Sequence, residues 1–260
     1  MLAPRIPAGW TKILSDVEIA HIDGGISPNA WAVDKTGNTY MQEGRNWRLV
    51  LGRPMQWVTS GQSGVWAIDS AGGTFFRTNV APLAPMGAFW DYADDSRRLV
   101  KIDSGPEGVV MAVDESNRVL LREGITAQNP RGTGWREVGT GYKHISASTY
   151  GYWVVDLNNQ VYFSSISGLG PFSARPRWTP VAGKFTQIKA GYGGSLWAVA
   201  PDGQLYEREG ITAITPTGNR WRRISNLKVS GVTSGMSGVF ASVQGTDEVI
   251  TTPGKPLAFL

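Results

Sequence analysis

The sequence has no cysteine and only two histidines, His21 and His144, among its 260 residues. Without cysteine there is no disulfide framework, no thiolate metal site and no thiol nucleophile. The motifs of zinc proteases, nucleophile-elbow hydrolases, phosphate-binding loops and EF-hands are absent as well. A single histidine at the start of an expected strand is more often structural than catalytic. We therefore expect no catalytic residues, no bound metal and no cofactor.

Long apolar runs and clusters of one charge are also missing. No apolar run approaches the roughly 20 residues that span a bilayer, and the start, MLAPRIPAGW, lacks the basic and apolar regions of a secretory signal. The 25 basic and 21 acidic residues are scattered, without a basic stripe that could follow phosphates. We expect a cytoplasmic protein, with release by a non-classical route left open, that neither inserts into membranes nor binds nucleic acid.

Glycine, proline and tryptophan are abundant. The chain contains 33 Gly, 15 Pro and 11 Trp, and Gly and Pro are typical of the turns between short strands. No window keeps apolar residues at helical spacing for more than about two turns. The composition and the patterning together indicate an all-β protein.

One unit recurs six times along the chain. The stretch Arg122–Trp135 (REGITAQNPRGTGW) returns 86 residues later as Arg208–Trp221 (REGITAITPTGNRW), and the two agree at nine of fourteen positions. Each unit opens with a tryptophan and continues through strands such as WAVD and TYMQE. The opening residues are Trp10, Trp47, Trp90, Trp135, Trp178 and Trp221. A strand-rich unit of about 43 residues is typical of a β-propeller.

The expected fold is a six-bladed β-propeller of four-stranded antiparallel blades, in one domain that covers residues 1–260. The repeats are expected at about 9–44, 46–80, 89–124, 134–167, 177–210 and 220–254. The second strand of each unit is rich in small residues (HIDGG, WVTSG, KIDSG), which suits a crowded innermost strand. The strand from Trp10 to Leu14 should then pair with Glu248–Thr252, join the C-terminal blade and close the ring.

The long connection from the fourth strand to the next tryptophan carries candidate ligand groups. After the third and fifth repeats it begins with Arg122, Glu123 and Gly124, and with Arg208, Glu209 and Gly210. A guanidinium and a carboxylate suit the vicinal hydroxyls of a sugar, and the glycine can bring backbone amides close to a ligand. The alternative is an ion pair that holds the connection in place. The connections at Gln42–Trp47 and Ser164–Trp178 lack the motif, so we expect fewer than six working sites.

Tyrosines in the turns between the second and third strands are further candidates. They are Tyr150, Tyr152 and Tyr192, and an exposed ring offers a π face to the C–H face of a sugar. The alternative is a solvent-facing loop tyrosine without a ligand. The expected strand order places these turns on the same face as the connections, so the two sets would meet between blades. Ile125 or Ile211 beside the polar groups would suit a methyl ether.

From Trp10 to about Gly254 the chain resembles the tectonin repeat. The pattern that carries the resemblance is GW-x-x-V, then a small-residue strand, then WAV-x-x-x-G-x-x-Y-x-x-E-G-I-T-x-x-x-P-x-G-x-x-W. The chain departs from it at Met111, Phe240 and Val249. Among other propeller families, the Gly-rich, seven-bladed RCC family has the sequence pattern most easily confused with this repeat.

The resemblance implies a propeller lectin. The nearest members are slime-mould and mushroom tectonins, which recognise O-methylated glycans, and more distant ones are fish-egg lectins and the horseshoe-crab lipopolysaccharide-binding lectin. The implied partners are glycans of bacterial or other foreign cell surfaces, bound multivalently in defence. The alternative is an intracellular propeller scaffold for protein–protein interaction, since one fold hosts both uses. A third hypothesis is an enzyme whose active site lies at the mouth of the propeller's central channel.

Overall fold

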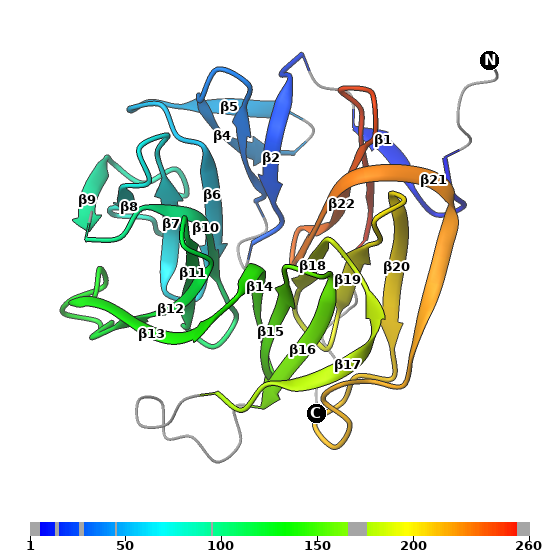
Figure 1. Cartoon of the computed structure of the whole chain (residues 1–260). Helices are drawn as coiled ribbons and strands as arrows, with labels where there is room; N and C mark the ends of the chain where they lie inside the picture. The colour runs from blue at the N-terminus through cyan, green and yellow to red at the C-terminus, as the bar shows by residue number, and fades with distance from the viewer. Residues whose placement is uncertain are drawn as a thin grey trace.

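The computed structural model describes residues 6–13, 16–25, 29–44, 46–94, 96–165 and 176–253. All regular structure in these residues is β-strand, from β1 to β23, in sheets arranged around a common axis (Figure 1). The prediction of an all-β protein is confirmed. None of the described segments forms a helix long and apolar enough to cross a membrane.

Four antiparallel sheets of four strands follow one another along the chain. They are β2 to β5 (Ile19–Asp23, Trp31–Asp34, Thr39–Glu43, Asn46–Val50), β6 to β9 (Trp57–Gly61, Gly64–Ile68, Thr74–Arg77, Trp90–Asp94), β10 to β13 (Leu99–Ser104, Val110–Asp114, Arg118–Glu123, Gly134–Thr140) and β14 to β17 (Tyr142–Ser148, Gly151–Asp156, Gln160–Ser165, Thr179–Lys184). The strand of small residues forms one edge of each sheet, next to the same strand of neighbouring sheets. The strand of the next repeat's opening tryptophan forms the other edge. Sheet and sequence repeat are therefore offset by one strand, as expected.

The remaining strands form one sheet of seven. Its order is β1 (Thr11–Ile13), β23 (Val249–Thr252), β22 (Gly238–Val243), β21 (Arg220–Gly235), β20 (Gln204–Glu209), β19 (Leu196–Val199) and β18 (Gln187–Ala190). Strand β21 pairs with β20 as far as Lys228 and with β22 from Val229 onward. The described residues therefore contain five sheets where six separate ones were expected, because β21 runs without a break from one set of strands into the next.

The two ends of the chain meet in that sheet. Strand β1 pairs antiparallel with β23, with Thr11 opposite Thr251 and Ile13 opposite Val249. This is the pairing that the repeat pattern predicts, apart from Leu14, which lies outside the described residues. Strand β1 thereby covers an edge of β23 that would otherwise be free to pair with another chain.

Apolar side chains fill the spaces between neighbouring sheets. Trp31, Trp66 and Trp153, from the WAVD-type strands, are among the largest fully buried side chains. The opening residues Trp90 and Trp178 are only partly buried and pack against the edges of two of the clusters. These tryptophans therefore serve packing, because aromatic rings contribute a large part of core burial.

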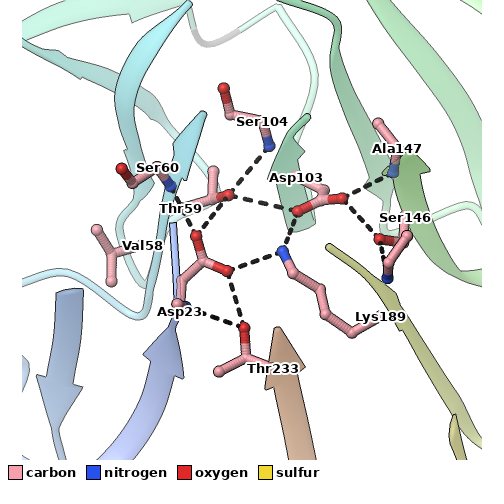
Figure 2. A network of polar contacts seen from close by, with 12 residues as sticks. Asp23, Val58, Thr59, Ser60, Asp103, Ser104, Ser146, Ala147, Lys189 and Thr233 are labelled. Carbon is pink, nitrogen blue, oxygen red and sulfur yellow. Dashed lines mark hydrogen bonds and ion pairs between the residues drawn. The ribbon is translucent and has the colours of Figure 1, made fainter. Parts of the chain in front are cut away.

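One hydrogen bond recurs where neighbouring innermost strands meet at the axis (Figure 2). A side-chain oxygen on one strand accepts the backbone N–H of a residue on the next. The acceptor and donor pairs are Asp23 and Ser60, Thr59 and Ser104, Asp103 and Ala147, Ser146 and Ala190, and Thr233 and Gly24. The bonds link β2, β6, β10, β14 and β18 in turn, and they link β21 back to β2.

Small residues at these junctions let the backbones approach closely enough for the bond. A Cβ atom added to Gly24 would lie 2.8 Å from the nitrogen of Gly235, and one added to Gly61 would overlap the carbonyl of Ser104. Any side chain at Gly24 or Gly61 would therefore push the strands apart. The prediction that crowding at the axis selects small residues agrees with this geometry.

Thr233→Val removes the junction acceptor while it keeps the shape of the side chain. The Gly24 N–H and the Asp23 carboxylate each lose a buried partner, which costs about 1–3 kcal/mol. We expect the free energy of unfolding in urea to fall by that amount. Thr179→Val, on an exposed part of β17, is the control and should change it by less than about 0.5 kcal/mol. Equal effects of the two substitutions would mean that the junction bond does not stabilise the fold.

Candidate functional site

Antiparallel pairing places the loops of each sheet at two opposite ends. In β10 to β13, Ser104 at the end of β10 pairs with Val110, and Glu123 at the end of β12 pairs with Gly134 at the same end of the sheet. The turn after the innermost strand and the long connection therefore share one face, here named the connection face. The opposite face carries turns that begin with an aspartate, such as Asp114, and is named the turn face.

Three connections are built around the same buried arginine. Each arginine donates from Nε to a backbone carbonyl nine residues later at 2.8 Å and lies over the ring of the tryptophan thirteen residues later at 5.1–5.3 Å. The sets are Arg77, Met86 and Trp90; Arg122, Arg131 and Trp135; Arg208, Thr217 and Trp221. A cation over an aromatic face, desolvated in this way, stabilises the loop.

The arginines predicted to bind a ligand are therefore held inside the protein. Arg122 is 3% exposed and Arg208 is 6% exposed. The guanidinium of Arg122 also pairs with Asp94 at 2.6 Å, whereas burial lowers the pKa of Arg208. The geometry favours the alternative that these side chains hold the connection in place, because Arg208 donates to carbonyls of the loop and Arg122 donates both to the loop and to β9.

The glutamates of the same motif lie farther out and pair with different arginines. Glu123 accepts from Arg136 at 2.6 Å, and Glu209 pairs with Arg220 and Arg222 at 2.7 Å each. Hydrogen bonding from Arg220 lowers the pKa of Glu209. The carboxylates are thus partly exposed and oriented by arginines of the following strand.

The glycines after the glutamates shape the loop. Gly124 and Gly210 have φ angles of 68° and 76°, in the left-handed region that favours glycine. A Cβ on Gly124 would lie 2.5 Å from Thr133 Oγ1, and one on Gly210 would overlap the side chain of Asn219. Their close contacts are within the connection itself.

The predicted tyrosines differ in burial and in what surrounds them. Tyr150 is half-buried in the turn between β14 and β15. Tyr152 is 9% exposed, packs in the cluster that contains Leu121, and burial raises its pKa. Its buried ring leaves little face for stacking on a sugar. Tyr192 lines the channel mouth on the connection face, where burial and then the charge of Glu107 raise its pKa to about 12.

The two isoleucines proposed beside the polar groups face the protein interior. Both are partly buried. Ile125 packs against the apolar cluster that contains Trp66, and Ile211 packs against the one that contains Trp153. Ile214, at the tip of the fifth repeat's connection, is 92% exposed. Apolar surface is therefore available at the tip of the connection and not at its base.

A second cluster of polar groups lies on the axis, and the sequence analysis did not predict it. In β18 the position of the junction acceptor is occupied by Lys189, whose ammonium cannot accept a hydrogen bond. It bridges Asp23, at 2.8 Å, and Asp103 instead (Figure 2). Burial would lower the pKa of Lys189, but the carboxylates of Asp103 and Asp23 outweigh that effect and hold its pKa above the ordinary value.

This ion triad divides the channel. A cavity of about 120 Å³ lies toward the turn face, and one of about 20 Å³ lies toward the connection face; Asp23 and Lys189 line both. The larger one, here named the channel cavity, is also lined by His21, Trp57, Lys101, His144 and Gln187. These residues share one position, two before the junction acceptor, in HID, WVT, KID, HIS and QIK. An alignment of the repeats could have found them.

Three side chains of the channel cavity, His21, His144 and Lys101, have pKa values shifted toward their neutral forms. His21 stacks on Trp57 with ring centroids 3.6 Å apart, and burial lowers its pKa to about 3. Burial also lowers the pKa of His144 well below its ordinary value and that of Lys101 to about 8. No cluster of three or more metal-ligating side chains occurs among the described residues.

The sequence relationships agree with the repeats and with this arrangement of sheets. A family model for the Tectonin domain matches residues 18–244. The chain belongs to the tectonin family. A tectonin β-propeller repeat-containing protein of Drosophila melanogaster is 31% identical over 208 residues, which cover 74% of this chain and 15% of that protein. Fish-egg lectin of Cyprinus carpio is 23% identical over 124 residues, 46% of this chain and 52% of the lectin.

Solved structures share the fold of this tectonin chain. The β-propeller domain of Cps50 (Swd1) from Myceliophteria thermophila superposes with a TM-score of 0.60 at 7% identity, over 92% of this chain and 98% of that one. At this identity the likeness shows the propeller fold alone. The chain spans only part of the length of the two tectonin relatives named above.

Lys189→Met should show how far the fold depends on the ion triad. The substitution leaves two buried carboxylates facing each other without a cation, and breaking a buried pair in this way costs about 3–5 kcal/mol. We expect a loss of that size in urea unfolding. Asp103→Asn added to Lys189→Met should restore part of it, because one charge is removed while an acceptor for Ala147 is kept. A double variant less stable than the single one would contradict the electrostatic explanation.

The buried imidazoles predict a fall in stability with acid. Their pKa values are lower in the folded state than in the unfolded chain, so the unfolded state binds more protons below about pH 6.5. Stability is full above that pH and is lost as the pH falls toward 5, by up to about 1.4 kcal/mol per pH unit for each histidine.

His21→Gln and His144→Gln isolate this effect in urea unfolding measured across the same pH range. Each should roughly halve the slope of the unfolding free energy against pH, and the double variant should abolish it. The nearby charge of Lys189 stays constant in this window, because its pKa is held above the ordinary value. An unchanged slope in the double variant would assign the acid sensitivity to other groups.

Proposed function

We propose that this chain is a multivalent carbohydrate-binding lectin whose sites lie on the connection face. The observation that carries the proposal is the repetition there of one loop geometry, in which three connections are fastened by equivalent arginines. Several weak sites on one rigid body bind a glycan-coated surface by avidity. The similarity to a protein named fish-egg lectin supports the same class.

We also infer that the chain is one domain, residues 1–260, of six blades closed into a ring. Strand β21 changes partner at Val229, so its first part completes the blade of β18 and its second part begins the blade of β1. Its second part also meets the first blade, since Thr233 accepts the N–H of Gly24. Divided at that point, the seven-stranded sheet supplies two four-stranded blades.

The ligand groups in this proposal are the charged residues around the buried arginines. Glu209 with Arg220 and Arg222, and Glu123 with Arg136, offer acceptors and donors that suit vicinal hydroxyls. Ile214, in the same connection as Glu209, offers an exposed apolar contact. Polar groups beside an apolar tip fit an O-methylated sugar of a bacterial or other foreign cell surface.

Glu209→Gln tests the ligand site. The charge that orients the two arginines and accepts from a sugar hydroxyl is removed, so we expect affinity for the bound glycan to fall about tenfold. Binding is measured on a glycan array and then by titration with the sugar identified, together with agglutination of bacterial cells. Glu137→Gln, on the exposed surface of β13, is the control and should bind as the parent chain does.

The rival function is a scaffold for a protein partner, which the same connections could bind. The propeller fold does not separate the two, because it hosts both. Saturable binding to a methylated or acylated sugar supports the lectin. No binding across a broad array, with an intact fold, would overturn it and leave the scaffold as the better explanation.

A further inference from the structure

The channel cavity has the dimensions of a site for a small ion. Its volume of about 120 Å³ lies below the roughly 300 Å³ at which ordinary small-molecule pockets begin. It lies at the end of the axis opposite the connections, so it is separate from the proposed glycan sites. A ligand in it can have only a few non-hydrogen atoms.

Lys101 brings to this cavity a positive charge that has no ion-pair partner among the described residues. Its ammonium lies 4.3 Å from the centroid of the Trp57 ring, and none of the described carboxylates forms an ion pair with it. Desolvation by burial is the cause that lowers its pKa, which agrees with the missing counter-charge. A partly buried ammonium without an anion is costly, so a bound anion would stabilise it.

His144 brings an unused hydrogen-bonding atom. The residue is 7% exposed, and its Nδ1 is buried without a hydrogen-bond partner among the described residues. A neutral imidazole has one donor and one acceptor nitrogen, so in the tautomer that carries the proton on Nδ1 this atom can donate to an oxygen of a ligand. The amide of Gln187 lines the same cavity and adds further donors.

The carboxylates deeper in the channel pair with Lys189 and not with Lys101, and the triad they form keeps a formal charge of −1. Asp23 and Asp103 are engaged by Lys189, and they stand two residues farther along the inner strands, roughly 6–7 Å away. After burial, Lys101 and Lys189 lower the pKa of both His21 and His144, while Asp103 opposes them weakly at His21. Both ammonium groups therefore act on the two imidazoles.

We propose that the channel cavity binds one small oxyanion, with the Lys101 ammonium as its counter-charge and the His144 imidazole as a hydrogen-bond donor to one of its oxygens. The same chemistry fits a tetrahedral inorganic anion or the carboxylate of a small acid. The Lys101 ammonium and the His144 imidazole reach one cavity from separate strands, β10 and β14, so the ion would also join two sheets at the axis.

Isothermal titration calorimetry with sulfate, inorganic phosphate and acetate tests the proposal, at constant ionic strength with chloride as the reference anion. We expect one site per chain. Lys101→Met keeps the aliphatic stem over Trp57 and should weaken binding at least tenfold, whereas Lys101→Arg should retain most of it. Lys184→Met, at the exposed end of β17, is the matched control. Preference for sulfate and phosphate over acetate would identify the tetrahedral class, and the reverse would identify the carboxylate class.

The pH dependence gives a second readout that a merely structural lysine would not show. Affinity for sulfate should fall as the pH rises through about 8, because sulfate keeps its charge while Lys101 loses its proton. Absence of binding by all three anions, or equal binding by the Lys101→Met variant, would overturn the proposal. Glycan binding should be unchanged in Lys101→Met, since the connections lie on the other face; the two proposals can therefore fail independently.

Discussion

The fold depends on a hydrogen bond between a side-chain oxygen of one innermost strand and a backbone N–H of the next. Innermost strands of neighbouring sheets belong to different ladders, so backbone pairing cannot hold them together. Asp23, Thr59, Asp103, Ser146 and Thr233 supply the missing acceptors. Because the donors are small residues, the strands come close enough for the bond, and each sheet is oriented around the axis by the one before it.

The one strand that lacks such an acceptor gives the axis its chemical character. Lys189 cannot take part in the junction bond, and its ammonium reaches two carboxylates on other sheets. The resulting triad separates a larger cavity from a smaller one. Buried histidines and an unpaired lysine then gather on one side, while the connections lie on the other. The two faces therefore carry different chemical groups.

The connections show why a repeated motif was easier to find than to interpret. The spacing of Arg208 and Trp221 is visible in the sequence, as is that of Arg122 and Trp135. That each guanidinium lies over its tryptophan and is withdrawn from solvent is visible only in space. The glutamates beside them looked like their partners, yet each pairs with an arginine of the following strand.

Periodicity was enough to predict the strands, their antiparallel order, the inner position of the small-residue strand and the pairing of β1 with β23, because these follow from local patterns that repeat. The burial of Tyr152 and of the two arginines, the continuous β21 and the Lys189 triad were not predictable in this way. Each depends on contacts between residues far apart in the chain, and a repeat pattern does not say which copy departs from the common arrangement or what its side chain then meets.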